Sequence, residues 1–266
     1  MKASIRVFTQ AKRGELEADN MDACWPGGDG EADRPVVRLA MADGATEHLL
    51  SGRWAAQVVR RLSRSPVRDV ASPERFARNI GVPGAGWVRS LAAYQQMREE
   101  QGEPLHWYEF SKLLEGSAVT VLALFLQDGE GTATRGTWHA AAIGDTNLFH
   151  SHVHGDQRTT AAFPLRHQAD FTDTPPLLLS EVFAEEEIRP RVRCMSGEWA
   201  SGDVFLLATD ALAAWICGAF EAGGDPWTEL DGATAGPEAF ASWLAGKRNE
   251  REMRNDDVTL LRLAIH

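Results

Sequence analysis

Five aspartates stand at the ends of apolar segments, where a fold can gather carboxylates from distant parts of a chain. Asp22 starts a short apolar segment, and Asp43 and Asp210 each end one. Asp145 lies between two such segments, and Asp256 immediately precedes the last. Carboxylates that are brought together repel one another and take up protons unless cations neutralise them. Ligand sets made only of oxygen atoms suit Mg²⁺ or Mn²⁺, whereas zinc prefers histidine or cysteine ligands.

Two such ions at a separation of about 3.5–4 Å can share a hydroxide and stabilise a phosphoryl displacement. Each aspartate alone has an ordinary explanation, because aspartate is common in turns and helix caps. Spacing in the sequence does not show that the five residues meet in space. Their repeated position at segment ends is what favours a shared carboxylate site.

The segments that must position these aspartates follow strand and helix periods. Alternating or compact apolar patterns predict strands at residues 4–9, 22–25, 36–42, 117–127, 136–143, 146–150, 204–209 and 257–265. Helical spacing predicts helices at residues 49–62, 87–100, 107–115, 211–220 and 237–251. We expect residues 63–85, which contain Pro66, Pro73 and Pro83, to form an irregular connection. We also expect turns and a solvated charged segment within residues 155–200.

This arrangement has more strands than βαβ units, and its helices come in blocks. It therefore favours an α+β fold with mainly antiparallel sheets and helices layered outside them. No convincing linker divides the 266 residues, so we expect a single domain over residues 1–266.

Composition excludes several classes of protein. The formal net charge of −11 argues against a protein that binds a nucleic-acid backbone, which would carry a basic face. Cys24, Cys194 and Cys217 are odd in number and far apart, which is typical of reduced thiols rather than of a disulfide framework. The first residues lack the apolar stretch of a secretory signal, and no apolar run is long enough to span a bilayer. We expect a soluble, cytoplasmic protein with no nucleic-acid or membrane partner.

Six short motifs, in order along almost the whole chain, resemble those of the PPM-type metal-dependent serine/threonine phosphatases, also called the protein phosphatase 2C family. Each motif is a short phrase, and the order of the six makes the resemblance specific. The motifs are Asn20-Met21-Asp22-Ala23, Ala42-Asp43-Gly44-Ala45, Gly116-Ser117-Ala118-Val119-Thr120, Ile143-Gly144-Asp145-Thr146, the segment 202–212 around Asp210, and Asn255-Asp256-Asp257-Val258-Thr259.

The resemblance implies a four-layer α-β-β-α sandwich, with two central, mainly antiparallel sheets and a binuclear Mn²⁺ or Mg²⁺ centre at one end. Asp43, Asp210 and Asp256 would ligate the first metal, and Asp43 would bridge to the second with help from the Gly44 carbonyl. Asp22 would orient the attacking water, and Asp145 matches an aspartate that holds a weaker third metal in some members. The implied reaction is attack of metal-activated water on a phosphoserine or phosphothreonine monoester.

The chain departs from the family pattern at several positions. Glu17 stands where a phosphate-binding arginine is usual, and Arg13 or Arg53 would have to replace that arginine. Met21 stands where Glu or Gln is common, and Ala214 where an aspartate often supports the third metal. The family's Asp-Gly-His-Gly-Gly phrase becomes the segment 43–47, which lacks the histidine. Bacterial members often lack it too, which favours a divergent bacterial branch.

The tract of His150, His152 and His154 would place three imidazoles on one face of a strand, a geometry compatible with a metal. We favour an exposed, polar strand end as its interpretation. The serines lack a nucleophile-elbow setting, and the glycine-rich stretches match neither a phosphate-binding loop nor a dinucleotide fingerprint.

The leading hypothesis is a cytoplasmic phosphoprotein phosphatase in bacterial signalling, with two Mn²⁺ or Mg²⁺ ions and a cognate kinase acting on the same phosphorylated protein. One alternative is a phosphatase fold with little turnover that serves as a regulatory or binding module. A second alternative is another carboxylate-metal hydrolase, such as a phosphodiesterase or nuclease. The acidic charge counts against that second alternative.

Overall fold

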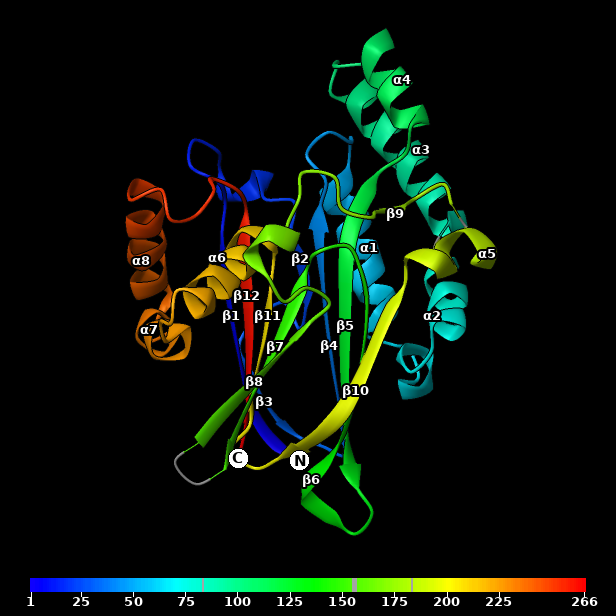
Figure 1. Ribbon diagram of the computed structural model, residues 1–266. Coiled ribbons are helices and arrows are strands. Elements are labelled where there is room, and N and C mark those ends of the chain that lie inside the picture. Colours follow the sequence, from blue (N-terminus) through cyan, green and yellow to red (C-terminus); the bar gives the residue numbers. More distant parts are fainter. Residues whose placement is uncertain (83, 155–156, 183) are drawn as a thin grey trace.

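Two β-sheets lie face to face in the computed structural model, which describes residues 1–82, 84–154, 157–182 and 184–266, and helices cover their outer faces (Figure 1). The first sheet has the strand order β3-β1-β12-β11-β7-β8. In that order its strands are Gly30–Asp33, Lys2–Gln10, Val258–Ile265, Val204–Ala208, Asn147–His154 and Gln157–Phe163. All the pairings in this sheet among the described residues are antiparallel.

The second sheet has the order β10-β6-β5-β4-β2, and the short strand β9 pairs with the start of β5. Its strands are, in that order, Arg193–Ala200, Thr132–Ile143, Ala118–Gly129, Val36–Gly44 and Ala23–Trp25, with β9 at Leu178–Leu179. These strands also pair antiparallel. The turn between β6 and β7, which contains Asp145, is one of the connections that take the chain from the second sheet to the first.

Helices from two parts of the chain form the outer layers (Figure 1). The second sheet is covered by α1, α2, α3 and α5, which span Ser51–Leu62, Pro73–Ile80, Gly84–Glu100 and Glu185–Ile188. The first sheet is covered by α6, α7 and α8, which span Asp210–Glu221, Pro226–Ala233 and Pro237–Asn249. Helix α4, Trp107–Leu114, follows α3 and projects with the outer half of α3 above the sandwich. The chain also contains short 3₁₀ turns at Glu17–Asp19, Val67–Val70, Gln168–Asp170 and Arg189–Arg191.

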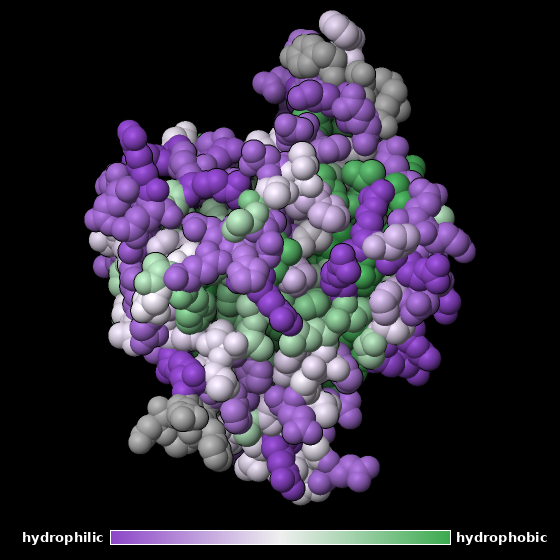
Figure 2. Space-filling model, viewed as in Figure 1, coloured by the Kyte–Doolittle hydropathy of each residue, from purple (hydrophilic) through white to green (hydrophobic). Residues whose placement is uncertain are grey.

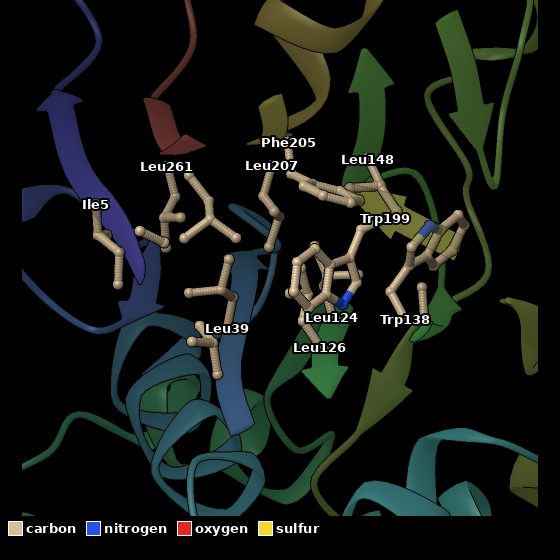
Figure 3. Close-up of a cluster of buried hydrophobic side chains, with 14 of the residues drawn as sticks. Ile5, Leu39, Leu124, Leu126, Trp138, Leu148, Trp199, Phe205, Leu207 and Leu261 are labelled. Carbon is tan, nitrogen blue, oxygen red and sulfur yellow. The ribbon is translucent and has the colours of Figure 1, made fainter. Parts of the chain in front are cut away.

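The central strands are buried on both faces, and this explains their nearly continuous apolar sequences. In β5, Leu122, Leu124 and Leu126 point into the core between the sheets, whereas Val121 and Phe125 point toward the helices. This division follows the two-residue period of a strand. Figure 3 shows the core between the sheets, whose labelled members are Ile5, Leu39, Leu124, Leu126, Trp138, Leu148, Trp199, Phe205, Leu207 and Leu261. The predicted four-layer α-β-β-α sandwich is confirmed.

The prediction of an irregular connection at residues 63–85 is wrong for residues 73–80, which form α2. Pro73 occupies the first helical position, where a missing N–H costs little. The Ser72 hydroxyl caps the helix by accepting a hydrogen bond from the Arg75 N–H at 3.3 Å. The proline therefore begins a helix here instead of breaking one. Pro83 lies outside the described residues.

The prediction of turns over residues 155–200 is also wrong in part, because the segment contributes β8 and β10 to the edges of the two sheets. An edge strand faces solvent along one side and need not be apolar throughout, so its pattern is weak. Glu185 to Glu187 lie in the first turn of α5, where the helix dipole favours acidic residues. Residues 155–156 and 183 of this segment lie outside the described residues.

The face in Figure 2 is largely hydrophilic, with hydrophobic residues gathered in a band across its middle and beneath the projecting part of α3 and α4. Within the described residues, none of the helices has both the length and the apolar character needed to cross a bilayer.

Candidate metal centre

The predicted aspartates follow or precede strands that end on the same side of the sandwich. Asp43 lies at the end of β4, opposite Thr120 of β5. It shares the strand face of Leu39 and Met41, both of which point into the core between the sheets, so it faces the same space at the sheet end. Asp210 follows β11, and its place in the first turn of α6 suits a negative charge.

One pocket of about 340 Å³ brings four of these aspartates together. It is lined by Asp43, Gly44, Asp145, Asp210 and Asp256 of the predicted set. The pocket also contains Thr120 of the third motif and residues that the sequence did not point to, among them His48, Asp173 and Arg254. The strand ends therefore gather carboxylates from four distant parts of the chain.

The carboxylates raise one another's pKa values. Burial raises the pKa of Asp43 well above its ordinary value, and the charges of Asp22, Asp210, Asp145 and Asp256 raise it further. Burial and the Asp210 charge raise the pKa of Asp145 to about 7. Burial also raises the pKa of Asp210, although the Arg254 guanidinium opposes that shift. Such shifts are typical of acids that share a site without enough positive charge.

Asp22 lies beside this pocket and lines a neighbouring cavity of about 360 Å³. Both of its carboxylate oxygens are buried without a hydrogen-bond partner among the described residues. Burial raises the pKa of Asp22 to about 8, and the charges of Asp257 and Asp210 add to the shift, whereas the Thr259 and Thr209 hydroxyls, which are near but make no hydrogen bond of good geometry with it, oppose the shift. Asp22 is thus adjacent to the other aspartates and contributes to their mutual repulsion.

Asp257 fixes the backbone around Asp22. Its Oδ1 accepts a hydrogen bond from the Lys12 N–H at 2.9 Å, and its Oδ2 accepts one from the Met21 N–H at 2.9 Å. Met21 is held close to Gly44, where an added Cβ would lie 2.8 Å from both the Met21 Cβ and its carbonyl oxygen. Glycine at position 44 therefore permits the close approach of the two predicted motifs, and Met21 brings no ligand oxygen in its side chain.

Arg254 is the residue with fixed positive charge among the described residues that line the pocket. Its Nη2 lies 2.6 Å from the Asp210 carboxylate, and its Nη1 lies 3.3 Å from that of Asp173. The sequence reasoning missed Arg254, although its position two residues before Asp256 already placed it near the last motif.

The two arginines that were expected to replace the missing family arginine lie elsewhere. Arg13 donates a hydrogen bond to the Asn249 side chain, and Arg53 stacks over the Tyr94 ring at 5.1 Å. Neither lines the aspartate pocket. Glu17 is exposed and accepts a hydrogen bond from the Ala11 N–H at 3.3 Å. Ala214 lines an adjacent cavity together with Asp173 and Arg254, and its methyl group offers no ligand atom.

The donor set fits hard divalent cations. It consists of carboxylate oxygens, which Mg²⁺ and Mn²⁺ prefer. The raised pKa values and the two orphan oxygens of Asp22 show that the carboxylates lack compensating positive charge. Among the described residues, no three of these carboxylates bring oxygens within 4.8 Å of one another, so bound ions would draw them inward.

No protein-family model matches the chain, and a search of curated proteins gives no significant match. Solved structures do match over nearly the whole length. The serine/threonine phosphatase of S. agalactiae superposes with a TM-score of 0.54 at 10% identity, covering 99% of this chain and 100% of that one.

The catalytic domain of the serine threonine protein phosphatase PstP, solved with two manganese ions, gives a TM-score of 0.51 at 16% identity and covers 99% of both chains. RsbX, solved with magnesium, gives 0.51 at 13% identity, covering 100% of this chain and 96% of that one. Likeness at these identities concerns the fold. The chain therefore has the PPM-type phosphatase fold, as the resemblance of its motifs predicted.

Proposed function

We propose that this chain is a metal-dependent phosphoprotein phosphatase that hydrolyses phosphoserine or phosphothreonine monoesters. The observation that carries the proposal is the gathering of Asp43, Asp145, Asp210 and Asp256 around one pocket, with Asp22 beside it. The likeness of the fold to serine/threonine phosphatases supports it. In this proposal residues 1–266 act as one phosphatase-like unit in the cytoplasm, on a phosphorylated protein that a cognate kinase supplies.

The aspartates would hold two Mn²⁺ or Mg²⁺ ions. Asp43, Asp210 and Asp256 would hold the first ion, and Asp43 and the Gly44 carbonyl would help to hold the second. Asp145 is left for a weaker third ion. When bound, the ions supply an activated water and neutralise the phosphoryl oxygens. Asp22, whose oxygens have no partner among the described residues, orients that water by accepting its hydrogen bonds.

Arg254 is proposed to bind the phosphoryl group in place of the family arginine. Arg254 lines the pocket and its side chain is 44% exposed, so a substrate can reach it. An ion bound to Asp210 would compete with the Asp210–Arg254 ion pair and release the guanidinium. The planar fork of donors in arginine then suits two phosphoryl oxygens.

His48 is proposed to protonate the leaving seryl or threonyl oxygen. Its Nδ1 lies 3.1 Å from the Gly116 carbonyl oxygen, which can only accept, so Nδ1 carries a proton. With Nδ1 engaged in this way, Nε2 is the ring nitrogen left to pass a proton to the leaving oxygen. This role falls to a histidine one residue beyond the segment 43–47, in which the family histidine is missing.

The experiment that tests the proposal measures hydrolysis of a phosphothreonine peptide and of p-nitrophenyl phosphate with added Mn²⁺, added Mg²⁺ or a chelator. We expect turnover that depends on metal and is lost in Asp43→Asn and Asp210→Asn. His48→Gln should lose about 100-fold in turnover and keep its metal affinity, as expected for loss of a general acid. Asp231→Asn, on an exposed surface pair with Arg262, is the matched control. Turnover that survives chelation or both aspartate variants would contradict the proposal.

A regulatory module with the same fold is the second candidate function, and the Met21 side chain against Gly44 favours it. A methionine at this position gives the second ion no side-chain oxygen. Metal binding measured by calorimetry, combined with no hydrolysis of either phosphoester by the wild-type chain, would select this candidate. Turnover on a phosphodiester above that on monoesters would instead point to another class of metal hydrolase.

A further inference from the structure

A second group of metal-ligating side chains lies at the opposite end of the strand pair β7 and β11. His150 and His152 belong to β7, which starts after Asp145, and Asp203 precedes β11, which ends before Asp210. Asp203 and Asp210 are seven positions apart along an extended segment, and at about 3.3 Å per residue their separation is roughly 20 Å. The group is therefore separate from the aspartate pocket.

The three side chains converge on one point. The Asp203 Oδ2 lies 2.8 Å from the His150 Nε2, and its Oδ1 lies 2.6 Å from the His152 Nδ1. These ligand atoms all lie within 4.8 Å of one another. The interpretation of the histidine tract as an exposed strand end is thus wrong for His150, which is 8% exposed. The side chain of His154 lies outside what the structure describes.

The surroundings hold this group in place from several sides. The His150 ring stacks on Phe205 at 4.1 Å with an interplanar angle of 3°, and Trp138 contacts it edge-on at 5.7 Å. Asp203 is 1% exposed, and its Oδ2 also accepts a hydrogen bond from the Ala200 N–H at 3.0 Å. Burial alone would raise the pKa of Asp203, but the hydrogen bonds from His150, Ala200 and His152 outweigh it and lower the pKa. The carboxylate is thus ionised and already aimed at two imidazole nitrogens.

We propose that His150 Nε2, His152 Nδ1 and Asp203 form a binding site for a single zinc-class cation. Imidazole and carboxylate are the donors that zinc takes, in contrast to the oxygen-only set at the other end of the sheet. Three protein ligands would leave a fourth position for water, and His152, whose side chain is 42% exposed, gives the group access to solvent.

Zinc requires only a small adjustment of this geometry. With zinc–ligand bonds of about 2.0–2.1 Å, tetrahedral ligands stand about 3.3 Å apart. The two nitrogens now lie 2.6 and 2.8 Å from the Asp203 oxygens. Each nitrogen must therefore move away from its Asp203 oxygen by less than about 1 Å, and the two nitrogens, which lie within 4.8 Å of each other, need to approach by no more than about 1.5 Å. The ion would take the place of the proton on each of these two nitrogens: a neutral ring keeps that proton on its other nitrogen, and a doubly protonated ring releases one proton to solvent.

The test uses the full chain carrying Asp43→Asn and Asp210→Asn, which removes the principal ligands of the aspartate pocket. Titration with Zn²⁺ against a competing chelator should give one tight equivalent, and Co²⁺ should give the visible absorption of a four-coordinate ion. His152→Ala on this background should weaken zinc binding at least 10-fold. His152→Gln should weaken it similarly, while its amide keeps a hydrogen bond to Asp203 and preserves the fold. His167→Ala, which removes an exposed histidine paired with Glu221, should change nothing.

Absence of the tight equivalent, or a zinc affinity in His152→Ala and His152→Gln that is unchanged from that of the parent double variant, would overturn the proposal. The three side chains would then be a metal-free hydrogen-bonded cluster. None of these readouts uses phosphoester hydrolysis, so failure of the proposed phosphatase function would leave this test intact.

Discussion

The buried aspartates at the two ends of the β7–β11 strand pair have pKa values that are shifted in opposite directions. At one end, Asp145 and Asp210 share a pocket with further carboxylates, and their pKa values are raised. At the other end, Asp203 receives hydrogen bonds from two histidines and one backbone amide, and its pKa is lowered. The ionised form of an aspartate is therefore destabilised in the aspartate pocket and stabilised beside the two histidines.

This difference shows which end depends on an added ion. In the aspartate pocket, the carboxylates repel one another because Arg254 supplies too little positive charge to neutralise them. Bound divalent cations would reduce this repulsion. The carboxylate of Asp203 has hydrogen-bond partners without a metal ion. The histidine cluster therefore does not need an ion to be stable, and a bound ion would only stabilise it further. Substitutions and changes of pH should therefore act on the two ends in opposite directions.

The largest expected effect is on turnover at the aspartate end. Asp43→Asn should lower kcat/KM at least 100-fold, because changes next to metal ligands alone cost about 10–100-fold. The same substitution should raise the melting temperature of the metal-free protein, since it removes one of the repelling charges. Steady-state kinetics and thermal unfolding in chelator measure the two effects. A metal-free melting temperature that falls would show that the carboxylates of this pocket do not repel one another.

The same substitution at the other end should have the reverse effect on stability. Asp203→Asn removes an ionised acceptor from two histidines, so the free energy of unfolding should fall by about 2–3 kcal/mol, as for hydrogen bonds to charged groups. Urea unfolding in chelator measures it. Asp231→Asn, in an exposed pair, should change stability by less than about 0.5 kcal/mol. Equal stability of Asp203→Asn and wild type would remove the contrast between the two ends.

Arg254→Gln should raise KM for a phosphopeptide about 10-fold, which corresponds to losing one charge-assisted contact of about 1.4 kcal/mol. It should also tighten the binding of Mn²⁺, because the ion would no longer compete with the guanidinium for Asp210. Arg262→Gln, which breaks an ion pair away from the pocket, should leave both quantities as they are. A lower Mn²⁺ affinity in Arg254→Gln would mean that the arginine supports the site instead of competing with the ion.

A further expected effect is a loss of thermal stability with rising pH in the metal-free protein. Burial raises the pKa of Asp22 to about 8 and that of Asp145 to about 7, both from the ordinary value of 3.8. The folded state then binds more protons than the unfolded state above about pH 4, so the stability that these groups contribute is lost as pH rises to about 8. Each kcal/mol lost should lower the melting temperature by about 2–4 °C.

Thermal unfolding in chelator between pH 6 and pH 8.5 should show this decline, and Mn²⁺ should abolish it. Asp22→Asn should make the decline shallower. A melting temperature in chelator that rises over this range would be inconsistent with protonated aspartates in the pocket.

The strands at the centre of the sandwich were the most predictable part of the fold. β5 and β12 carry apolar residues on both faces, and the predicted bounds at residues 117–127 and 257–265 differ from the structure by at most two residues. Strand β10 was missed because an edge strand is half exposed and carries polar residues such as Ser196 and Glu198. Helix α2 was missed because Pro73 begins it.

The aspartates were predictable because each stands next to a strong strand pattern, so the ends of well-defined strands placed them. The places of Arg254 and His48 in the pocket were not predictable, because both residues lie in loops that have no periodic pattern. The histidine cluster was misjudged for a similar reason. Only the pairing of β7 with β11 brings Asp203 beside His150 and His152, and local sequence does not encode that long-range contact.

The outer half of α3 and the whole of α4 stand clear of the two sheets (Figure 1). The inner half of α3 is anchored through Trp87, which packs edge-on against Trp54 at 5.3 Å, whereas Trp107 at the start of α4 is 85% exposed. Lengthening a connecting segment at the protein surface costs little free energy of folding once the two ends of the segment are fixed. This part of the chain can therefore accumulate substitutions and insertions over evolutionary time without disturbing the carboxylate pocket, so related chains could diverge here first.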